Sequence, residues 1–327
     1  MSESKKQPIV GGQAVIEGVM MRGKDGIATA VRKKDGEINV DFEQYIPLNK
    51  RNKILSLPII RGFMTYIDSL IVGVKILNKS ADIFEDDGDD TSNEKPSKFD
   101  LFIEKHFKDN YKEIIVGVSL VVSLILTLGV FYLLPNIITN AFTKIGLTNS
   151  IILNIIESVI RVSILVGYMS IISIQKDVKR LFRYHGAEHK TIFCYENDEK
   201  LTVENARKYT TLHPRCGTSF IFVVFFVSLV VYLFLGWQHG IMRIVSRLLL
   251  LPIISGISYE LIRLMATNNN VFLKAIAFPG LMFQKITTKE PSDDMLEVAI
   301  AALKKAEGIE YEDDNNETIK DELREAL

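Results

Sequence analysis

IIVGVSLVVSLILTLGVFYLL, residues 114–134, decides the fold, because it is a long apolar run without a charged side chain. An α-helix rises about 1.5 Å per residue, so roughly 20 apolar residues span the hydrocarbon of a bilayer. Similar runs follow at residues 151–174, 218–237 and 241–265, and 47% of the 327 residues are hydrophobic. We predict a mainly α-helical integral membrane protein with about four transmembrane helices, interfacial amphipathic helices and a small N-terminal β-hairpin unit.

The distribution of lysine and arginine predicts which side each connection faces. Residues 175–217 carry nine of these side chains, residues 135–150 carry one, and residues 238–240 carry none. Basic loops stay on the cytoplasmic side of a membrane, and the basic stretches at 32–34 and 50–53 belong to that side too. We therefore expect a multi-pass protein of the cytoplasmic membrane with both termini and the 175–217 loop in the cytoplasm.

Residues 1–53 are expected to form the N-terminal β-rich unit. Two strand-like runs, 26–32 and 37–42, are joined through Lys34-Asp35-Gly36, a hairpin signal. Before them, GGQAVIEGVMMRG at 11–23 has glycines that indicate tight turns or close backbone approach rather than a plain strand. A phosphate-binding loop is the alternative for this run, but neither G-x-G-x-x-G nor G-K-[ST] is present.

Residues 54–83 are apolar but carry Arg61, Asp68, Lys75 and Asp82 at seven-residue intervals. On a helix these four side chains make one charged stripe. We expect a helix in the membrane interface, with the alternative of a helix that enters the membrane and turns its stripe toward a polar partner.

The remaining segments outside the spans are predicted from composition. Residues 84–113 are expected to be an acidic linker and a short interfacial helix with Phe99, Phe102, Ile103 and Phe107 on one side. The segment 271–308 ends in an amphipathic helix between an N-cap at Ser292 and a closing Gly308. Residues 309–327 form an acidic tail.

Several charged residues fall within the predicted spans, where a charge is costly unless it is paired or hydrated. Glu157 and Arg161 are four residues apart on one helix, and Glu260 and Arg263 are three apart, so each pair could neutralise itself. Arg243 and Arg247 also belong to this group. The alternative is a polar cavity between helices that opens toward the 175–217 loop.

The 175–217 loop contains His185, His189, His213 and both cysteines of the chain, Cys194 and Cys216. His185 and His189 share a helix face, and a helix–turn–helix return would bring His213 and Cys216 back over them. Imidazole and thiolate are preferred zinc ligands. We predict a divalent metal, zinc by ligand type, bound by His185, His189 and His213, with Cys216 as fourth ligand or close neighbour. Two cysteines in such a loop fit a reducing compartment better than a disulfide framework.

The role of Glu188 distinguishes a catalytic metal site from a structural one. It completes the His-x-x-Glu-His pattern of inverted zinc peptidases and could act as general base on a water. It could equally pair with Arg183 or Lys190 on the helix surface. The distal carboxylate that those peptidases use as third ligand has no obvious counterpart among Glu196, Glu199, Glu204 and Glu260.

Four motifs in order make the chain similar to the YqhQ family of bacterial membrane proteins. They are 11–23, 184–190 (YHGAEHK), 212–219 (LHPRCGTS) and 279–291 (PGLMFQKITTKEP). The resemblance implies a membrane protein with a presumed metal site, since members are commonly labelled predicted metal-dependent enzymes. It names no reaction.

Two hypotheses from different classes remain at this point. One is a membrane enzyme with a hydrolytic metal site that uses Glu188. The other is a scaffold or transport-related protein whose closed His/Cys site only fixes the loop to the third span. The lipid bilayer is the expected partner in both; the substrate or protein partner is unknown, and no nucleic-acid-binding motif is visible.

Overall fold

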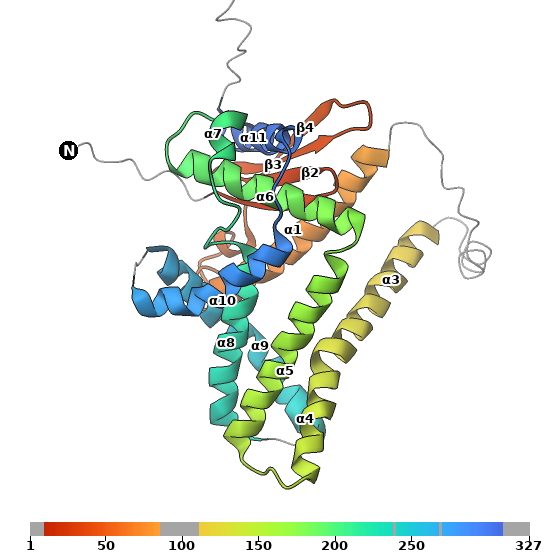
Figure 1. Ribbon diagram of the computed structural model, residues 1–327, viewed down its shortest axis with the longest axis vertical. Helices are drawn as coiled ribbons and strands as arrows, with labels where there is room; N and C mark the ends of the chain where they lie inside the picture. The colour runs from red at the N-terminus through yellow and green to blue at the C-terminus, as the bar shows by residue number, and fades with distance from the viewer. Residues whose placement is uncertain (1–9, 86–110, 238–239, 268–269, 310–327) are drawn as a thin grey trace, which may run out of the picture.

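The computed structural model describes residues 10–85, 111–237, 240–267 and 270–309, and it is mainly helical, as predicted. A part that contains the β-sheet lies above a bundle of long helices (Figure 1). The linker expected at 86–98, the helix expected at 99–107 and the tail from 310 lie outside the described residues.

Among the described residues, four helices are long and apolar enough to cross a membrane, which confirms the predicted number. These stretches are Gly117–Lys144, Ser150–Ile172, Gly217–Leu235 and Val245–Met265. They belong to α3 (Tyr111–Leu128) with its continuation, α5 (Ser150–Ile172), α8 (Gly217–Leu235) and α9 (Gly240–Thr267). Large apolar side chains are exposed along the first of them, Leu124, Ile125 and Leu126 among others, so this helix presents the surface that lipid requires.

The first span continues beyond residue 134, the end of the apolar run predicted for it, and through Pro135. It passes through a π-helical turn, η2 (Gly129–Leu133), into α4 (Leu134–Lys144). Proline has no N–H to donate and clashes with the carbonyl four residues earlier, here that of Phe131. The wider π turn accommodates the proline, and the Phe131 carbonyl accepts a hydrogen bond from Nε of Arg161 at 3.2 Å. A second helix therefore satisfies the backbone group that the proline leaves open.

The N-terminal unit is a four-stranded antiparallel sheet in the order β1-β2-β3-β4. The predicted hairpin is the pair β3 (Gly26–Arg32) and β4 (Ile38–Gln44). Residues 11–23 form two strands, β1 (Gly11–Val15) and β2 (Gly18–Arg22), which the sequence did not predict, but the expected turn and close backbone approach are present at residues 16–17 and at the glycines. Gly18 allows β2 to approach β3 closely, because a Cβ on it would lie 2.1 Å from the Ala30 carbonyl oxygen.

Three helices enclose the sheet. One sheet face packs its side chains, such as Met21 and Ala30, against α11 (Asp293–Glu307), and the other packs Val15 and Met20 against α1 (Ile60–Glu85). Figure 1 shows α6 (Lys176–Glu196) running along the sheet, and it packs against β1, the edge strand. The predicted C-terminal helix is confirmed between Ser292 and a left-handed Gly308.

The charged stripe of α1 makes ion pairs with other elements; whether the helix lies in the interface or enters the membrane stays a prediction. Arg61 makes a bidentate pair with Glu260 of α9 at 2.6 Å, and Lys75 pairs with Glu43 of β4 at 2.7 Å. Glu260, for which the sequence offered Arg263 as a partner, thus pairs with a side chain of another helix. Leu70, Ile71 and Val74, elsewhere on the helix, are exposed. The helix thus joins the sheet to the bundle and leaves an apolar strip uncovered.

The other elements are short or connect these. The 3-10 turn η1 (Leu48–Lys50) precedes α1, α7 (Val203–Arg207) follows α6, and α10 (Val271–Thr287) packs against α8. Thr202 caps α7 by accepting from the backbone N–H of Asn205.

Candidate functional site

Three parts of the chain meet where the sheet-containing part joins the bundle. Helix α6 contributes His185, Glu188 and His189; the segment before α8 contributes His213 and Cys216; and the C-terminal end of α10 contributes the Thr287 carbonyl. The predicted return of the chain over the face of α6 is therefore present.

His185, His189 and Cys216 form a cluster that could hold a metal ion. Their ligand atoms all lie within 4.8 Å of one another. Nε2 of His185 is 3.2 Å from Sγ of Cys216, and the two imidazole ring centroids are 4.5 Å apart. His189 and Cys216 are both buried, so a ligand bound here would be largely shielded from water.

Backbone carbonyls orient both imidazole rings of the cluster. Nδ1 of His185 donates to the Thr287 carbonyl at 2.8 Å, and Nδ1 of His189 donates to the Thr211 carbonyl at 2.5 Å. A ring that donates through Nδ1 presents Nε2 as a lone-pair donor. Burial lowers the pKa of His189, which favours the neutral ring, and its Nε2 is buried with no partner among the described residues.

Cys216 occupies the N-cap of α8. Its sulfur accepts from the Thr218 backbone N–H at 3.4 Å and lies 3.2 Å from the Thr218 hydroxyl. The positive end of the helix dipole points at the same atom. This is the environment that a metal-bound thiolate requires.

Glu188 is buried rather than paired on the surface of α6. Its side chain faces β1, where a Cβ on Gly12 would lie 2.8 Å from its Cγ and Oε1 atoms. The Gly12 N–H donates to the carboxylate, while Oε2 has no partner among the described residues. Burial raises the pKa of Glu188, against smaller opposing effects of His185 and His213. The surface pairing with Arg183 or Lys190 is not made.

His213 lies beside the cluster and outside the three-residue group. Its ring centroid is 5.5 Å from that of His189, and its Nε2 is 3.5 Å from a Glu196 oxygen. Burial lowers the pKa of His213 to about 4, so the ring is neutral at physiological pH. The role of His213 as a metal ligand stays a prediction.

Two residues position the site without having been singled out as site residues in the sequence. Gln284 of α10 accepts from the His213 N–H and donates to the His213 carbonyl, both at 2.8 Å, which fixes the turn before Cys216. Gly186 lets residues 287–289 approach α6, because a Cβ there would lie 2.0 Å from the Lys289 carbonyl oxygen. Both belong to motifs that carried the family resemblance, and that was their only sequence signal.

A cavity of about 450 Å³ opens over the cluster. It is lined by His185, Glu188, His189, His213 and Cys216 and by residues of β1 and α1, including Gly12, Gln13 and Ser69. Cavities of a few hundred Å³ are the size that small ligands occupy. The chain therefore combines buried metal-ligand atoms, a buried carboxylate and room for a small molecule.

These features define a membrane-type helical protein with a His/Cys cluster at the base of its sheet-containing part. Residues 57–308 match the family described as "Protein of unknown function (DUF1385)", and the chain belongs to that family. It is 36% identical over 307 residues, 92% of each chain, to the "Uncharacterized protein YqhQ" of Bacillus subtilis (strain 168). No solved structure matches.

Proposed function

We propose that this membrane protein is a metal-dependent hydrolytic enzyme with zinc bound by His185, His189 and Cys216. One observation carries the proposal: a three-ligand cluster and a buried carboxylate line the same cavity. Three protein ligands leave a coordination position for water or substrate, as in catalytic zinc sites, whereas four close the site.

The residues present fit the metal. His189 has a buried Nε2 with no partner among the described residues, and backbone carbonyls fix both rings with Nε2 turned inward. Mixed imidazole and thiolate donors suit zinc better than the hard cations calcium and magnesium. A bound zinc ion would supply Lewis acidity and lower the pKa of a water molecule.

The chain's own residues would move and hold the proton in this reaction. Glu188 would accept it on Oε2, the oxygen that no described residue engages, and the Gly12 N–H would hold the carboxylate in place. Burial raises the pKa of Glu188, which makes the carboxylate a stronger base than an exposed one. His213, neutral and beside His189, would border the reacting group.

The site is proposed to face the cytoplasm. The basic 175–217 connection that carries the cluster supports this orientation through the positive-inside rule. The exposed apolar strip of α1, with Leu70, Ile71 and Val74, would then rest in the cytoplasmic interface of the bilayer.

A second candidate function is a non-enzymatic scaffold or transport-related protein with a structural metal. The observation in its favour is the neutral ring of His213, 5.5 Å from that of His189. A small rotation would bring it in as a fourth ligand and close the site.

The substitution Glu188→Gln separates the two functions. The enzyme proposal expects purified Glu188→Gln protein to retain zinc, one ion per chain by elemental analysis, and cells that depend on it to show the phenotype of a deletion. Glu204→Gln, an exposed carboxylate on α7, is the matched control and should behave as wild type. Full function of the Glu188→Gln protein in cells would leave only the structural role.

Metal content is tested separately from catalysis. His189→Ala and Cys216→Ala should each lose the zinc, while Cys194→Ser should keep it, because the Cys194 sulfur is turned toward the Glu199 and Lys200 carbonyls. Wild-type protein purified without metal after growth in zinc-supplemented medium would overturn the metal proposal.

A further inference from the structure

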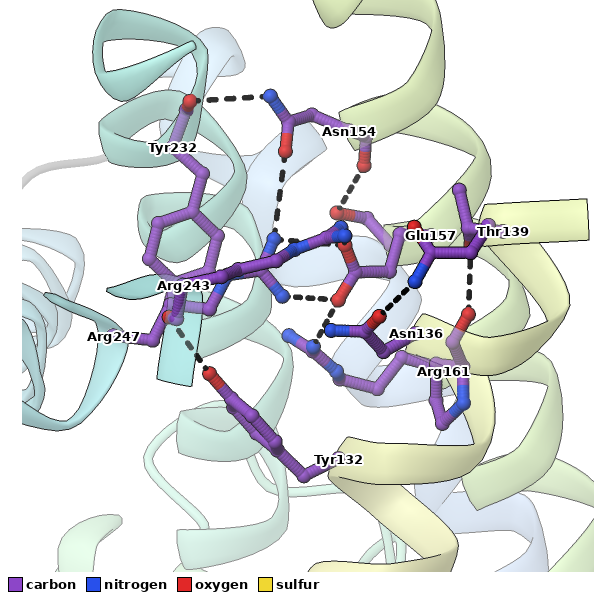
Figure 2. A network of polar contacts seen from close by, with 12 residues as sticks. Tyr132, Asn136, Thr139, Asn154, Glu157, Arg161, Tyr232, Arg243 and Arg247 are labelled. Atoms are coloured by element: carbon purple, nitrogen blue, oxygen red, sulfur yellow. Dashed lines mark hydrogen bonds and ion pairs between the residues drawn. The ribbon is translucent and has the colours of Figure 1, made fainter. Parts of the chain in front are cut away.

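Charged side chains of α5 and α9 meet inside the helix bundle (Figure 2), in the N-terminal halves of both helices. Arg161 and Glu157 of α5 pair at 2.7 Å, as their spacing predicted. Arg243 and Arg247 of α9 bond to the same carboxylate. The cluster lies away from the 175–217 loop, so the predicted polar opening toward that loop is not formed by these residues.

The cluster carries more positive than negative charge. Three guanidinium groups surround one carboxylate, and among the described residues no second acidic side chain pairs with any of the three. Glu157 is 1% exposed and the arginines are 3 to 8% exposed. A buried charge within a membrane-spanning bundle requires a counter-charge or water. A bound anion would supply such a counter-charge.

Two N–H donors in this region lack acceptors among the described residues. Nε of Arg243 and Nε1 of Trp237 are both buried and have no hydrogen-bond partner. The guanidinium carbon of Arg243 lies 3.5 Å from the centroid of the Trp237 ring, so the two side chains that carry these donors stack on each other. The corresponding Nε of Arg161 is occupied by the Phe131 carbonyl, which singles out Arg243.

A small cavity lies against the same arginine. Its volume is about 10 Å³, and it is lined by Asn154, Tyr232, Leu235, Gly236, Arg243, Ser246 and Arg247. This is room for about one water-sized species, too little for a phosphate group with its four oxygens. The lining offers guanidinium donors and contains no carboxylate.

We propose that this cavity binds one small anion of the halide class, chloride being the abundant one, between α5, α8 and α9. The anion offsets part of the excess positive charge and accepts from the Arg243 side that Glu157 does not engage. It would tie the ends of three membrane-compatible helices together, independently of any metal at the His/Cys cluster.

The chain provides its own probe, because Trp237 is its single tryptophan. Protein purified in detergent with gluconate as the anion is titrated with sodium chloride while Trp237 fluorescence and the thermal midpoint are recorded. We expect a saturable fluorescence change and a rise of the midpoint. Arg243→Gln should raise the apparent dissociation constant for chloride about tenfold or more, which is the effect of losing a charge-assisted hydrogen bond. Arg263→Gln, an exposed arginine farther along α9, should leave it unchanged.

Trp237→Phe guards against a folding defect in Arg243→Gln. Phenylalanine keeps a six-membered ring against Arg243 and removes the five-membered ring with its N–H. Because Trp237 does not line the cavity, chloride should still raise the thermal midpoint of this variant. Several outcomes would overturn the proposal: a wild-type protein without a saturable response, an equal response in folded Arg243→Gln, or saturation by phosphate and not by chloride.

Discussion

Nε2 of His185 lies 3.2 Å from Sγ of Cys216, although 31 positions of the chain separate the two residues. His185 belongs to α6, which packs against the sheet, and Cys216 caps α8, which is long and apolar enough to cross a membrane. A metal bound between them would therefore cross-link the sheet-containing part to the bundle. The catalytic and structural proposals both include this mechanical link.

Metal removal is expected to lower stability. Binding to the folded protein alone adds RT ln(1 + [L]/Kd), about 4 kcal/mol when the free metal is a thousandfold above Kd. Chelation should therefore lower the thermal midpoint of the wild-type protein in detergent by several degrees, and added zinc should restore it. The thermal midpoint of His189→Ala, which lacks one metal ligand, should be the same with and without chelator. Equal midpoints for chelated and zinc-loaded wild type would contradict this.

The thiol of Cys194 is expected to react slowly in the folded protein and faster as the pH rises. Burial raises its pKa to about 11, so at pH 8 only about a thousandth is thiolate, against roughly a quarter for an ordinary cysteine. Labelling of Cys216→Ser protein, in which Cys194 is the remaining cysteine, should be roughly 250-fold slower when native than when unfolded. A native rate that is flat between pH 8 and 10 would show that something other than ionisation limits it.

Local patterns predicted the parts of the fold that depend on neighbouring residues. The four apolar runs, the hairpin around Lys34–Gly36 and the capped helix from Ser292 to Gly308 each follow from composition or periodicity over a short window. The pairing of Glu157 with Arg161 is equally local, since four residues on a helix bring them together.

Long-range contacts account for what the sequence did not reveal. The helix continues through Pro135 because Arg161 of another helix satisfies the Phe131 carbonyl. The α1 stripe turns inward because Glu260 and Glu43 lie opposite it. The spacing of the motifs predicted that His213 and Cys216 return to His185, but it did not predict which of the two lies nearer. The position of this turn depends on Gln284, which bonds the His213 backbone although it is 71 positions away in the chain.

Asp68 is expected to be the most sensitive member of the α1 stripe. It is fully buried, accepts from the Tyr45 hydroxyl and the Leu48 N–H, and pairs with Arg22 at 3.1 Å. Asp68→Asn leaves the guanidinium without its carboxylate and should cost about 3 kcal/mol, the penalty for breaking a buried pair. Asp82→Asn, exposed on the same stripe, should leave stability unchanged. Thermal or denaturant unfolding in detergent compares the two, and equal losses would refute the ranking.

Gly12→Ala should impair function through Glu188, whereas Gly11→Ala should be tolerated. A Cβ on Gly12 would lie 2.8 Å from the Glu188 carboxylate and also 2.8 Å from the Met20 carbonyl oxygen, but one on Gly11 meets nothing within 4 Å. The strand backbone cannot easily yield, so the carboxylate must move off its Gly12 N–H and away from the cavity. Zinc content should stay at the wild-type level in both variants, since neither touches His185, His189 or Cys216. Cells carrying Gly12→Ala should resemble those with Glu188→Gln, and cells carrying Gly11→Ala the wild type. If Gly12→Ala instead loses its metal, or if both variants function fully, β1 does not act by holding Glu188.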